Sequence, residues 1–208
     1  RGYPYSYRHD SFQKVERDLK DCCSVLNMGM WQNVPDLNAL DYLYLGSLTG
    51  QYFYKGNIPM SSFAIRKGCF MPLARMNIAF LPEIIPAFYQ FTGNVCGIGR
   101  YGDIFSGLLI MKIAHHLDKD VTYGLPLCIH NKEPRDVFRD IASELESIKL
   151  NETMHKVLNM IPLEKHSYAE CYVELAEGLL AHKDKFHLSD YIAYLSERMK
   201  GWVEAVEA

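Results

Sequence analysis

Three glycines with the spacing G-x-G-x-x-G, at Gly97, Gly99 and Gly102, form the first pattern in this sequence that suggests chemistry. In dinucleotide-binding proteins such glycines connect a strand to a helix, and an acidic residue about 20 positions later contacts a ribose. Here the residues before Gly97 have the pattern of a helix and a turn, and the later Asp118 and Asp120 flank a turn. The surrounding sequence therefore argues against a dinucleotide site.

Asp118 and Asp120 also form a D-x-D pair, and paired carboxylates suit Mg²⁺ or Mn²⁺. The pair lies at the polar end of an expected helix, where a solvated turn uses the same residue types. We interpret it as a surface feature and not as a metal site.

Arg100, Tyr101 and Asp103 come just before a long apolar segment that has the pattern of a helix. Asp103 could cap this helix, because the helix dipole stabilises an anion at the first turn. Alternatively, its carboxylate could face a sugar hydroxyl or act as a base, with Arg100 beside it for a phosphate. The spacing alone leaves both interpretations open.

His130 and Lys132 follow a strand-like segment, with Asn131 between them. Ligands bind at the carboxyl ends of strands in open α/β sheets. An imidazole and an ammonium at such an edge suit a metal and a diphosphate, although a single histidine can equally be structural.

The elements that must position these residues change in character along the chain. Up to residue 59 the sequence is irregular, with a polar helical stretch expected near 11–21 and a strand-like run over 24–31. Strand, helix, helix and strand patterns then follow in order, over 75–80, 82–91, 104–117 and 121–129. This order indicates α/β layering with part of a sheet.

The remainder of the chain has helical patterns only. A charged helix is expected over 133–149, and apolar residues recur at helical spacing over 168–179 and 191–203. We therefore expect an α/β part over 1–132 and a helical cap over 133–208.

Composition excludes several classes of protein. With 22 Lys and Arg against 25 Asp and Glu, the net charge of −3 gives no large basic surface for nucleic acid. No apolar run approaches the roughly 20 residues that span a bilayer, and no secretory signal opens the sequence, so we expect a cytoplasmic protein. Six cysteines without C-x-x-C spacing are expected to be reduced and mostly buried.

Two smaller features concern the ends and the surface. A chain that opens on Arg1 without Met is expected to be a fragment or a processed product. Asn151 begins an N-x-T glycosylation sequon, which has little meaning in a cytoplasmic chain.

Taken together, these segments resemble the reversibly glycosylated polypeptides, the family of UDP-arabinopyranose mutases on a GT-A type glycosyltransferase scaffold. The likeness runs in the family's order over nearly the whole chain, through 1–8, 29–36, 67–80, 98–107, 124–132, 171–175 and 202–205. It implies the C-terminal portion of a GT-A fold with a helical cap. It also makes the G-x-G-x-x-G spacing a coincidence.

The resemblance further implies an enzyme that binds UDP-arabinose with Mn²⁺ or Mg²⁺, interconverts its pyranose and furanose forms and becomes glycosylated on an arginine. Arg1 matches one of two arginines important for activity in the family. The resemblance places the uridine pocket and the acidic metal motif in an N-terminal half that precedes this chain.

The same resemblance assigns roles to the candidate residues. Asp103 is expected to act on the sugar as a general base or hydroxyl acceptor, and His130 to bind the metal or the diphosphate. Asn77 could contact the sugar or be a structural amide bonded to backbone. The substrate-binding candidates are Asn77, Arg100, Tyr101 and Lys132.

Several positions depart from the family pattern. Gly102 stands where the family carries an acid, Arg75 and Leu81 replace a glycine and an acid, and a charged segment is inserted at 9–21. These changes leave two alternatives to a mutase: a glycosyltransferase with another acceptor, and a non-catalytic subunit that forms homo- or hetero-oligomers with family members.

Overall fold

The computed structural model describes residues 1–8, 16–53 and 61–208. The strands are β1 (Glu16–Arg17), β2 (Ser24–Asn33), β3 (Phe63–Ile65), β4 (Ile78–Phe80) and β5 (Asp120–His130). The α-helices are α1 (Ala39–Tyr44), α2 (Gly102–His116), α3 (Val137–Met160), α4 (Tyr168–Ala181) and α5 (Ser189–Glu207). Short 3-10 turns are η1 (Tyr5–Tyr7), η2 (Pro82–Ala87) and η3 (Lys183–Lys185).

The five strands form one mixed sheet in the order β1-β3-β5-β2-β4. β2 and β5 run parallel, with Asn33 opposite His130 at their carboxyl ends, whereas the other neighbours are antiparallel. The predicted α/β class is confirmed. The parallel pair brings the ends of two strands that are distant in the sequence to one edge, which is the edge that carries ligand sites in sheets of this kind.

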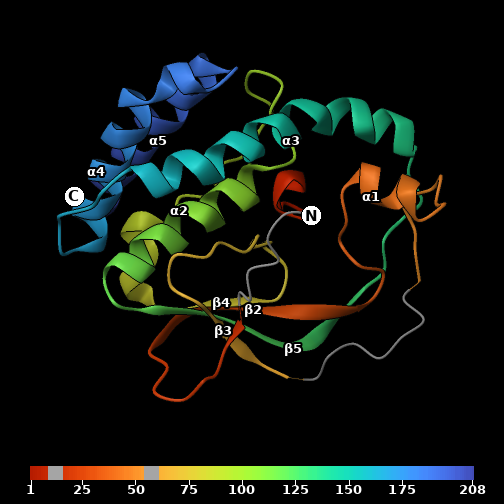
Figure 1. The fold of residues 1–208 in the computed structure, drawn as a ribbon, viewed down its shortest axis with the longest axis horizontal. Coiled ribbons are helices and arrows are strands. Elements are labelled where there is room, and N and C mark those ends of the chain that lie inside the picture. Colours follow the sequence, from red (N-terminus) through yellow and green to blue (C-terminus); the bar gives the residue numbers. More distant parts are fainter. Residues whose placement is uncertain (9–15, 54–60) are drawn as a thin grey trace.

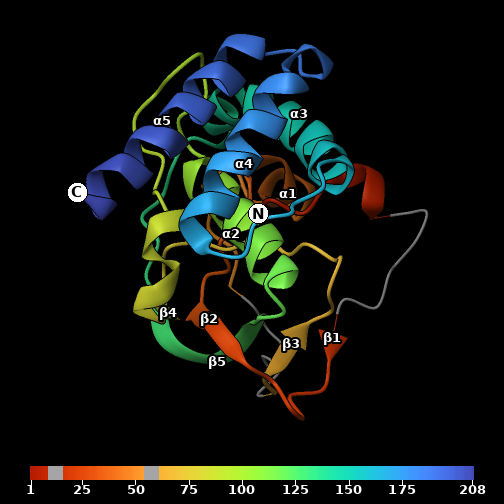
Figure 2. The same ribbon diagram turned by 90° about the vertical axis from the view of Figure 1, so that its left-hand side faces the viewer.

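All the labelled helices lie on one side of the sheet in both ribbon views (Figures 1 and 2). Met28 and Tyr123 are register partners and are buried on this side. Helix α2 lies between the sheet and the outer helices, and its residues are buried nearly all round the helix. A helix that is apolar on all sides is the expected solution for such a middle layer.

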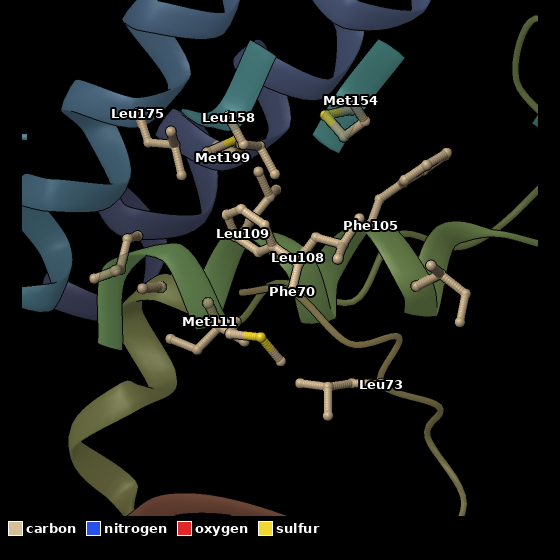
Figure 3. Close-up of a cluster of buried hydrophobic side chains, with 14 of the residues drawn as sticks. Phe70, Leu73, Phe105, Leu108, Leu109, Met111, Met154, Leu158, Leu175 and Met199 are labelled. Carbon is tan, nitrogen blue, oxygen red and sulfur yellow. The ribbon is translucent and has the colours of Figure 1, made fainter. Parts of the chain in front are cut away.

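The main core is continuous from the sheet through α2 to the outer helices. Figure 3 shows its centre, where side chains of α2 meet those of α3, α4, α5 and the 70–73 segment. The labelled members are Phe70, Leu73, Phe105, Leu108, Leu109, Met111, Met154, Leu158, Leu175 and Met199.

The helical part agrees with the periodicity of the sequence, except at both ends of the helix predicted over 133–149. Helices α4 and α5 cover the predicted stripes, but α3 begins at Val137 and continues to Met160. It begins after Asp136, whose side chain accepts hydrogen bonds from two backbone amides of the first turn. Its second half continues because Leu150, Met154 and Leu158 keep an apolar face toward the core. The division at 132/133 stays a prediction.

Other expectations need correction. The predicted helix over 11–21 lies partly outside the described residues, and within them Glu16–Arg17 is a strand. Only Ile78–Phe80 of the predicted strand is extended, and Pro82–Ala87 forms a 3-10 helix with Pro86 inside it. All six cysteines lie in the described part of the chain. Only Cys69 and Cys171 of these six are buried, so the prediction that most are buried is wrong.

The structure gives different outcomes for the G-x-G-x-x-G and D-x-D patterns, to which we assigned no ligand. Gly97 has a φ of +81° and forms a turn, while Gly102 begins α2 with its α-carbon against the carbonyl of Phe91, so that a β-carbon there would overlap this oxygen. Asp118 is exposed as predicted, but Asp120 is buried and its Oδ1 lies 2.5 Å from Nη2 of Arg17. The surface interpretation is therefore wrong for Asp120.

Within the described ranges, no helix is both long and apolar enough to cross a membrane.

Candidate functional site

The candidate site lies where β2 and β5 end side by side. The chain continues from β2 into Asp36 and from β5 into Lys132, so both residues emerge at this edge. The first turn of α2 reaches the same place with Asp103, and Arg1 links the two elements. The edge therefore gathers two carboxylates, a guanidinium and an ammonium from four separate parts of the chain.

Arg1 is the centre of the cluster. Its Nη2 lies 2.7 Å from Oδ2 of Asp103 and 3.3 Å from Oδ2 of Asp36, and its Nη1 donates to the carbonyl of Arg100 at 3.1 Å. Its side chain is only 12% exposed. Burial alone would lower the pKa of this guanidinium, but the combined attraction of the neighbouring acids, led by Asp36 and Asp103, raises it.

Asp103 is placed by the start of α2 but does not cap it. The N-cap residue is Tyr101, which makes no side-chain capping bond. Oδ1 of Asp103 accepts from the backbone amide of Ile104 at 3.0 Å, and Oδ2 faces Arg1. The capping interpretation is therefore wrong in detail, although the carboxylate does lie at the positive end of the helix dipole.

Tyr101 lies beneath this pair and is fully buried. The guanidinium carbon of Arg1 is 6.0 Å from the centroid of its ring. Burial raises the pKa of Tyr101, so the phenol stays neutral at physiological pH. Its ring forms part of the floor of the cluster.

The side chain of Arg100, a predicted substrate-binding residue, turns toward α3, and a contact with the substrate stays a prediction. Its Nη1 lies 2.6 Å from Oδ1 of Asp140, and its Nε lies 3.3 Å from Oε1 of Glu144. Oε2 of Glu144 accepts from the backbone amide of Ala39 at the start of α1, and burial raises the pKa of this glutamate. The guanidinium of Arg100 thus connects α3 to the site, and its carbonyl is the group that reaches Arg1.

Lys132 is 8% exposed and points over an aromatic ring. Its Nζ lies 4.2 Å from the centroid of the Tyr42 ring, a cation–π arrangement. Burial lowers the pKa of Lys132 to about 8, against the attraction of Asp36. Because this ammonium is poorly exposed to solvent, an anion bound beside it would be weakly screened and would interact strongly.

His130 ends β5, and within residues 1–8, 16–53 and 61–208 one of its ring nitrogens, Nε2, has no hydrogen-bond partner. Its Nδ1 lies 2.7 Å from the carbonyl oxygen of Val34, and because a carbonyl only accepts, Nδ1 holds the proton. The lone pair is then on Nε2. A ring oriented in this way by a backbone carbonyl is suited to metal binding.

Asn77 is not brought together with these residues. Its Nδ2 donates to the carbonyls of Met30 at 2.7 Å and Leu125 at 3.2 Å. The amide lies over Gly29. Successive residues of a strand point to opposite faces of the sheet, and Met28 points to the face covered by helices. Asn77 therefore lies on the opposite face. This geometry favours the structural alternative, and a sugar contact at Asn77 stays a prediction.

A pocket of about 400 Å³ opens beside Arg1 and Asp36, between the sheet and the start of α2. Its walls are mostly apolar and aromatic, including Trp31, Phe63 and Tyr123. The charged groups lie at its border. An apolar pocket with a few polar groups is the usual form of a small-molecule site.

Asp36 and Glu144 are the members of the cluster that sequence reasoning did not single out. Asp36 follows a predicted strand just as Lys132 does, so the signal was present once the two strands were known to be parallel. Glu144 carried no such signal, because a glutamate in a charged helix is normally solvated.

The described residues hold no group of three or more His, Cys, Asp or Glu side chains arranged for a metal ion. His130 is therefore a single candidate ligand.

Comparison with known proteins identifies the family. A family model described as reversibly glycosylated polypeptide matches residues 1–208. The chain is 31% identical over 210 residues to "Probable UDP-arabinopyranose mutase 1" of Pisum sativum. The aligned region covers 99% of this chain and 52% of the relative. It is 30% identical over 211 residues to "UDP-arabinopyranose mutase 3" of Arabidopsis thaliana. That alignment covers 100% of this chain and 53% of the relative.

A further relative, "UDP-arabinopyranose mutase 1" of Oryza sativa subsp. japonica, is 28% identical over 209 residues. The chain spans about half the length of these curated relatives. Because the family model matches every residue from 1 to 208, the chain belongs to the reversibly glycosylated polypeptide family.

Proposed function

We propose that this chain forms the sugar side of an enzyme that interconverts UDP-arabinopyranose and UDP-arabinofuranose. The observation that carries the proposal is Arg1, held between Asp36 and Asp103 at the carboxyl ends of two parallel strands, beside a pocket. The relatives named UDP-arabinopyranose mutase support the choice of reaction.

In this reaction the bond between the diphosphate and the anomeric carbon breaks, the sugar changes its ring size, and the same bond forms again. UDP is therefore both the leaving group and the returning nucleophile, and no other reactant is consumed. The protein must neutralise charge that grows on the diphosphate as the bond breaks. Arg1, which is half-buried, and Lys132, which is buried, are cations at this edge that can do so.

The carboxylates have a different task. Asp103 and Asp36 accept hydrogen bonds, and sugar hydroxyls are donors that match them. Asp103 takes the role of hydroxyl acceptor or general base, and it holds Arg1 when no sugar is present. Tyr101 and the carbonyl of Arg100 support Arg1 from below.

The proposed metal, Mn²⁺ or Mg²⁺, would add positive charge at the diphosphate. Nε2 of His130 is suited to one coordination position. Because the described residues hold no ligand group of three, we place the other ligands in the part of the relatives' length that this chain does not span.

Glycosyl transfer to another acceptor is the second candidate. It is favoured by Gly102, where the backbone leaves no room for the acid that the family pattern carries. The two activities differ in product, since a mutase releases a UDP-furanose and a transferase forms a new glycoside. Self-glycosylation on arginine, a cytoplasmic location and association with other family members stay proposals.

Calorimetric titration of the chain with UDP-arabinopyranose and Mn²⁺ tests the proposal. We expect binding in the micromolar range that is lost in Asp103→Ala and His130→Ala. Asp118→Ala is the control, because Asp118 follows the opposite end of α2 and its side chain is 91% exposed. Absence of binding to the unaltered chain, or equal loss in the control, would contradict a sugar site in these residues.

A further inference from the structure

We propose that Asn151 and Glu152 of α3 are positioning residues that hold Arg1 in the site. The inference rests on the proposed function, since it assumes that Arg1 acts on the substrate. It also assigns a task to a helix that the sequence places in the cap.

Glu152 binds the segment that follows Arg1. One carboxylate oxygen accepts from the backbone amide of Tyr5, and the other accepts from the amide of Ser6 at 3.1 Å and from its hydroxyl at 2.6 Å. In the described part of the chain, all hydrogen bonds of this carboxylate go to these two residues. A carboxylate that accepts from successive amides fixes the backbone of the turn η1.

Asn151 binds closer to Arg1. Its Nδ2 donates to the carbonyl of Gly2 at 2.8 Å. Gly2 has a φ of +90°, and a β-carbon there would lie 2.7 Å from Cγ2 of Ile104 and 2.8 Å from Cβ of Pro72. The residue after Arg1 is therefore fixed from both sides, and only glycine fits it.

The same asparagine begins the N-x-T sequon noted in the sequence. It is only 3% exposed. Its amide is thus unavailable to a glycosylating enzyme in the folded chain and is used to bind Gly2 instead.

Helix α1 holds the other side of the segment. The hydroxyl of Tyr5 lies 3.0 Å from Oδ1 of Asn38 and 3.0 Å from Oδ1 of Asp41. Nη1 of Arg8 lies 2.6 Å from the same oxygen of Asp41. Residues 1–8 are therefore clamped between α1 and α3, and Figure 1 shows the N-terminal turn beneath α3.

The clamp matters because a misplacement of about 1 Å in a reacting group can cost roughly a hundredfold in rate. Arg1 reaches Asp36 and Asp103 only while Gly2 and η1 stay in place. Loss of the Glu152 carboxylate frees two backbone amides and lets this segment move away from the edge.

Labelling with phenylglyoxal, read by mass spectrometry at each arginine, tests the proposal without any substrate. The measured quantity is the labelling rate of Arg1 divided by that of Arg17 in the same sample. Arg17 is a suitable reference because it is also ion-paired, with Asp120, far along the sheet. General loosening of the fold raises both rates, whereas release of the clamp raises the rate of Arg1 alone.

We expect Glu152→Ala to raise the ratio severalfold and Glu152→Gln, which keeps one acceptor oxygen, to raise it less. Glu146→Ala is the matched control on α3, since Glu146 pairs with Lys149 and His187 at the surface. An unchanged ratio in Glu152→Ala, or a parallel rise at both arginines, would overturn the proposal. If the ratio rises but the unaltered chain binds no UDP-arabinopyranose, positioning stands and the proposed function falls.

Discussion

The helical cap and the polar edge of the sheet are built in opposite ways. The buried side chains of α4 and α5 are mostly apolar, with Leu175 and Leu195 fully enclosed and Ser196 a buried polar exception. At the edge, charged side chains lie together, and the guanidinium of Arg1 contacts the carboxylates of both Asp36 and Asp103. Burial of an apolar side chain stabilises the fold without a specific partner, whereas a buried charge requires its partner because no water is there to replace it.

The comparison teaches where stability and specificity come from in this chain. Burial of apolar area contributes about 25 cal/mol per Å², and this contribution involves no titrating group. Paired charges at the edge contribute little net free energy, but they fix the positions of particular atoms. We expect the cap to control unfolding and the edge to control binding.

The largest effect should come from the cap. Leu195→Ala removes a fully buried side chain from α5 and should lower the free energy of unfolding by about 2–5 kcal/mol. Leu180→Ala on α4, where the leucine is 38% exposed, is the control and should cost much less. Denaturant unfolding measures both, and equal losses would contradict a tightly packed cap.

His155 of α3 gives a pH-dependent test at the junction of the two regions. Its ring lies between those of Tyr7 and Phe70, and burial lowers its pKa to about 4 from an ordinary 6.5. As pH falls from 6.5 to 4 the unfolded chain takes up a proton that the folded chain refuses. His155 should therefore lower the free energy of unfolding over this window by roughly 3 kcal/mol and contribute no pH dependence above it.

Unfolding curves between pH 7 and pH 4 measure this dependence. His155→Phe should reduce the slope by about half, because His115, whose pKa burial also lowers to about 4, contributes the remainder. His166→Phe, at an exposed position, should leave the slope unchanged. An unchanged slope in His155→Phe would contradict the contribution of His155.

Two aspartates compare a buried ion pair with an exposed one. Asp103→Asn leaves Arg1 with one carboxylate and should lower the free energy of unfolding by about 1–3 kcal/mol. Asp118→Asn removes an exposed partner of Lys67 and should cost about 0–1 kcal/mol. Thermal unfolding of the two variants at low and high salt checks the difference, and similar losses would mean that the edge is effectively solvated.

The smallest effect concerns binding at Lys132. Its pKa of about 8 means that the ammonium loses its proton as pH rises above 8. If it neutralises the diphosphate, affinity for UDP-arabinopyranose should be constant below this pH and fall by at most about tenfold per pH unit above it. Titration calorimetry from pH 7 to pH 9 checks this, and Lys132→Met should remove the dependence.

The sequence predicted the two regions unequally. Helices α2, α4 and α5 follow from apolar residues at helical spacing, because every turn of these helices meets the core. The end of α3 was missed, since Asn151, Glu152 and His155 interrupt the apolar pattern with polar side chains. These residues are polar because they contact the N-terminal segment, which no local pattern shows.

The polar edge was predicted only in part. Asp103, His130 and Lys132 could be selected because each lies at the end of a predicted element. Asp103 meets Arg1, which lies 102 positions before it, and the ends of β2 and β5 lie side by side only because the two strands pair in parallel. Neither contact can be read from local spacing. Arg100 and Asn77 were expected at the substrate, and their bonds to α3 and to backbone carbonyls could not be read from spacing.

A side chain at position 102 would require a change in the loop around Phe91 as well. The α-carbon of Gly102 rests against the carbonyl of Phe91, so any side chain at 102 requires the preceding loop to move. An acid cannot be restored there by a single substitution. To convert this chain to the family pattern, one would have to graft the 88–101 loop of a relative together with the acid, since either replacement alone would leave an intermediate that packs poorly.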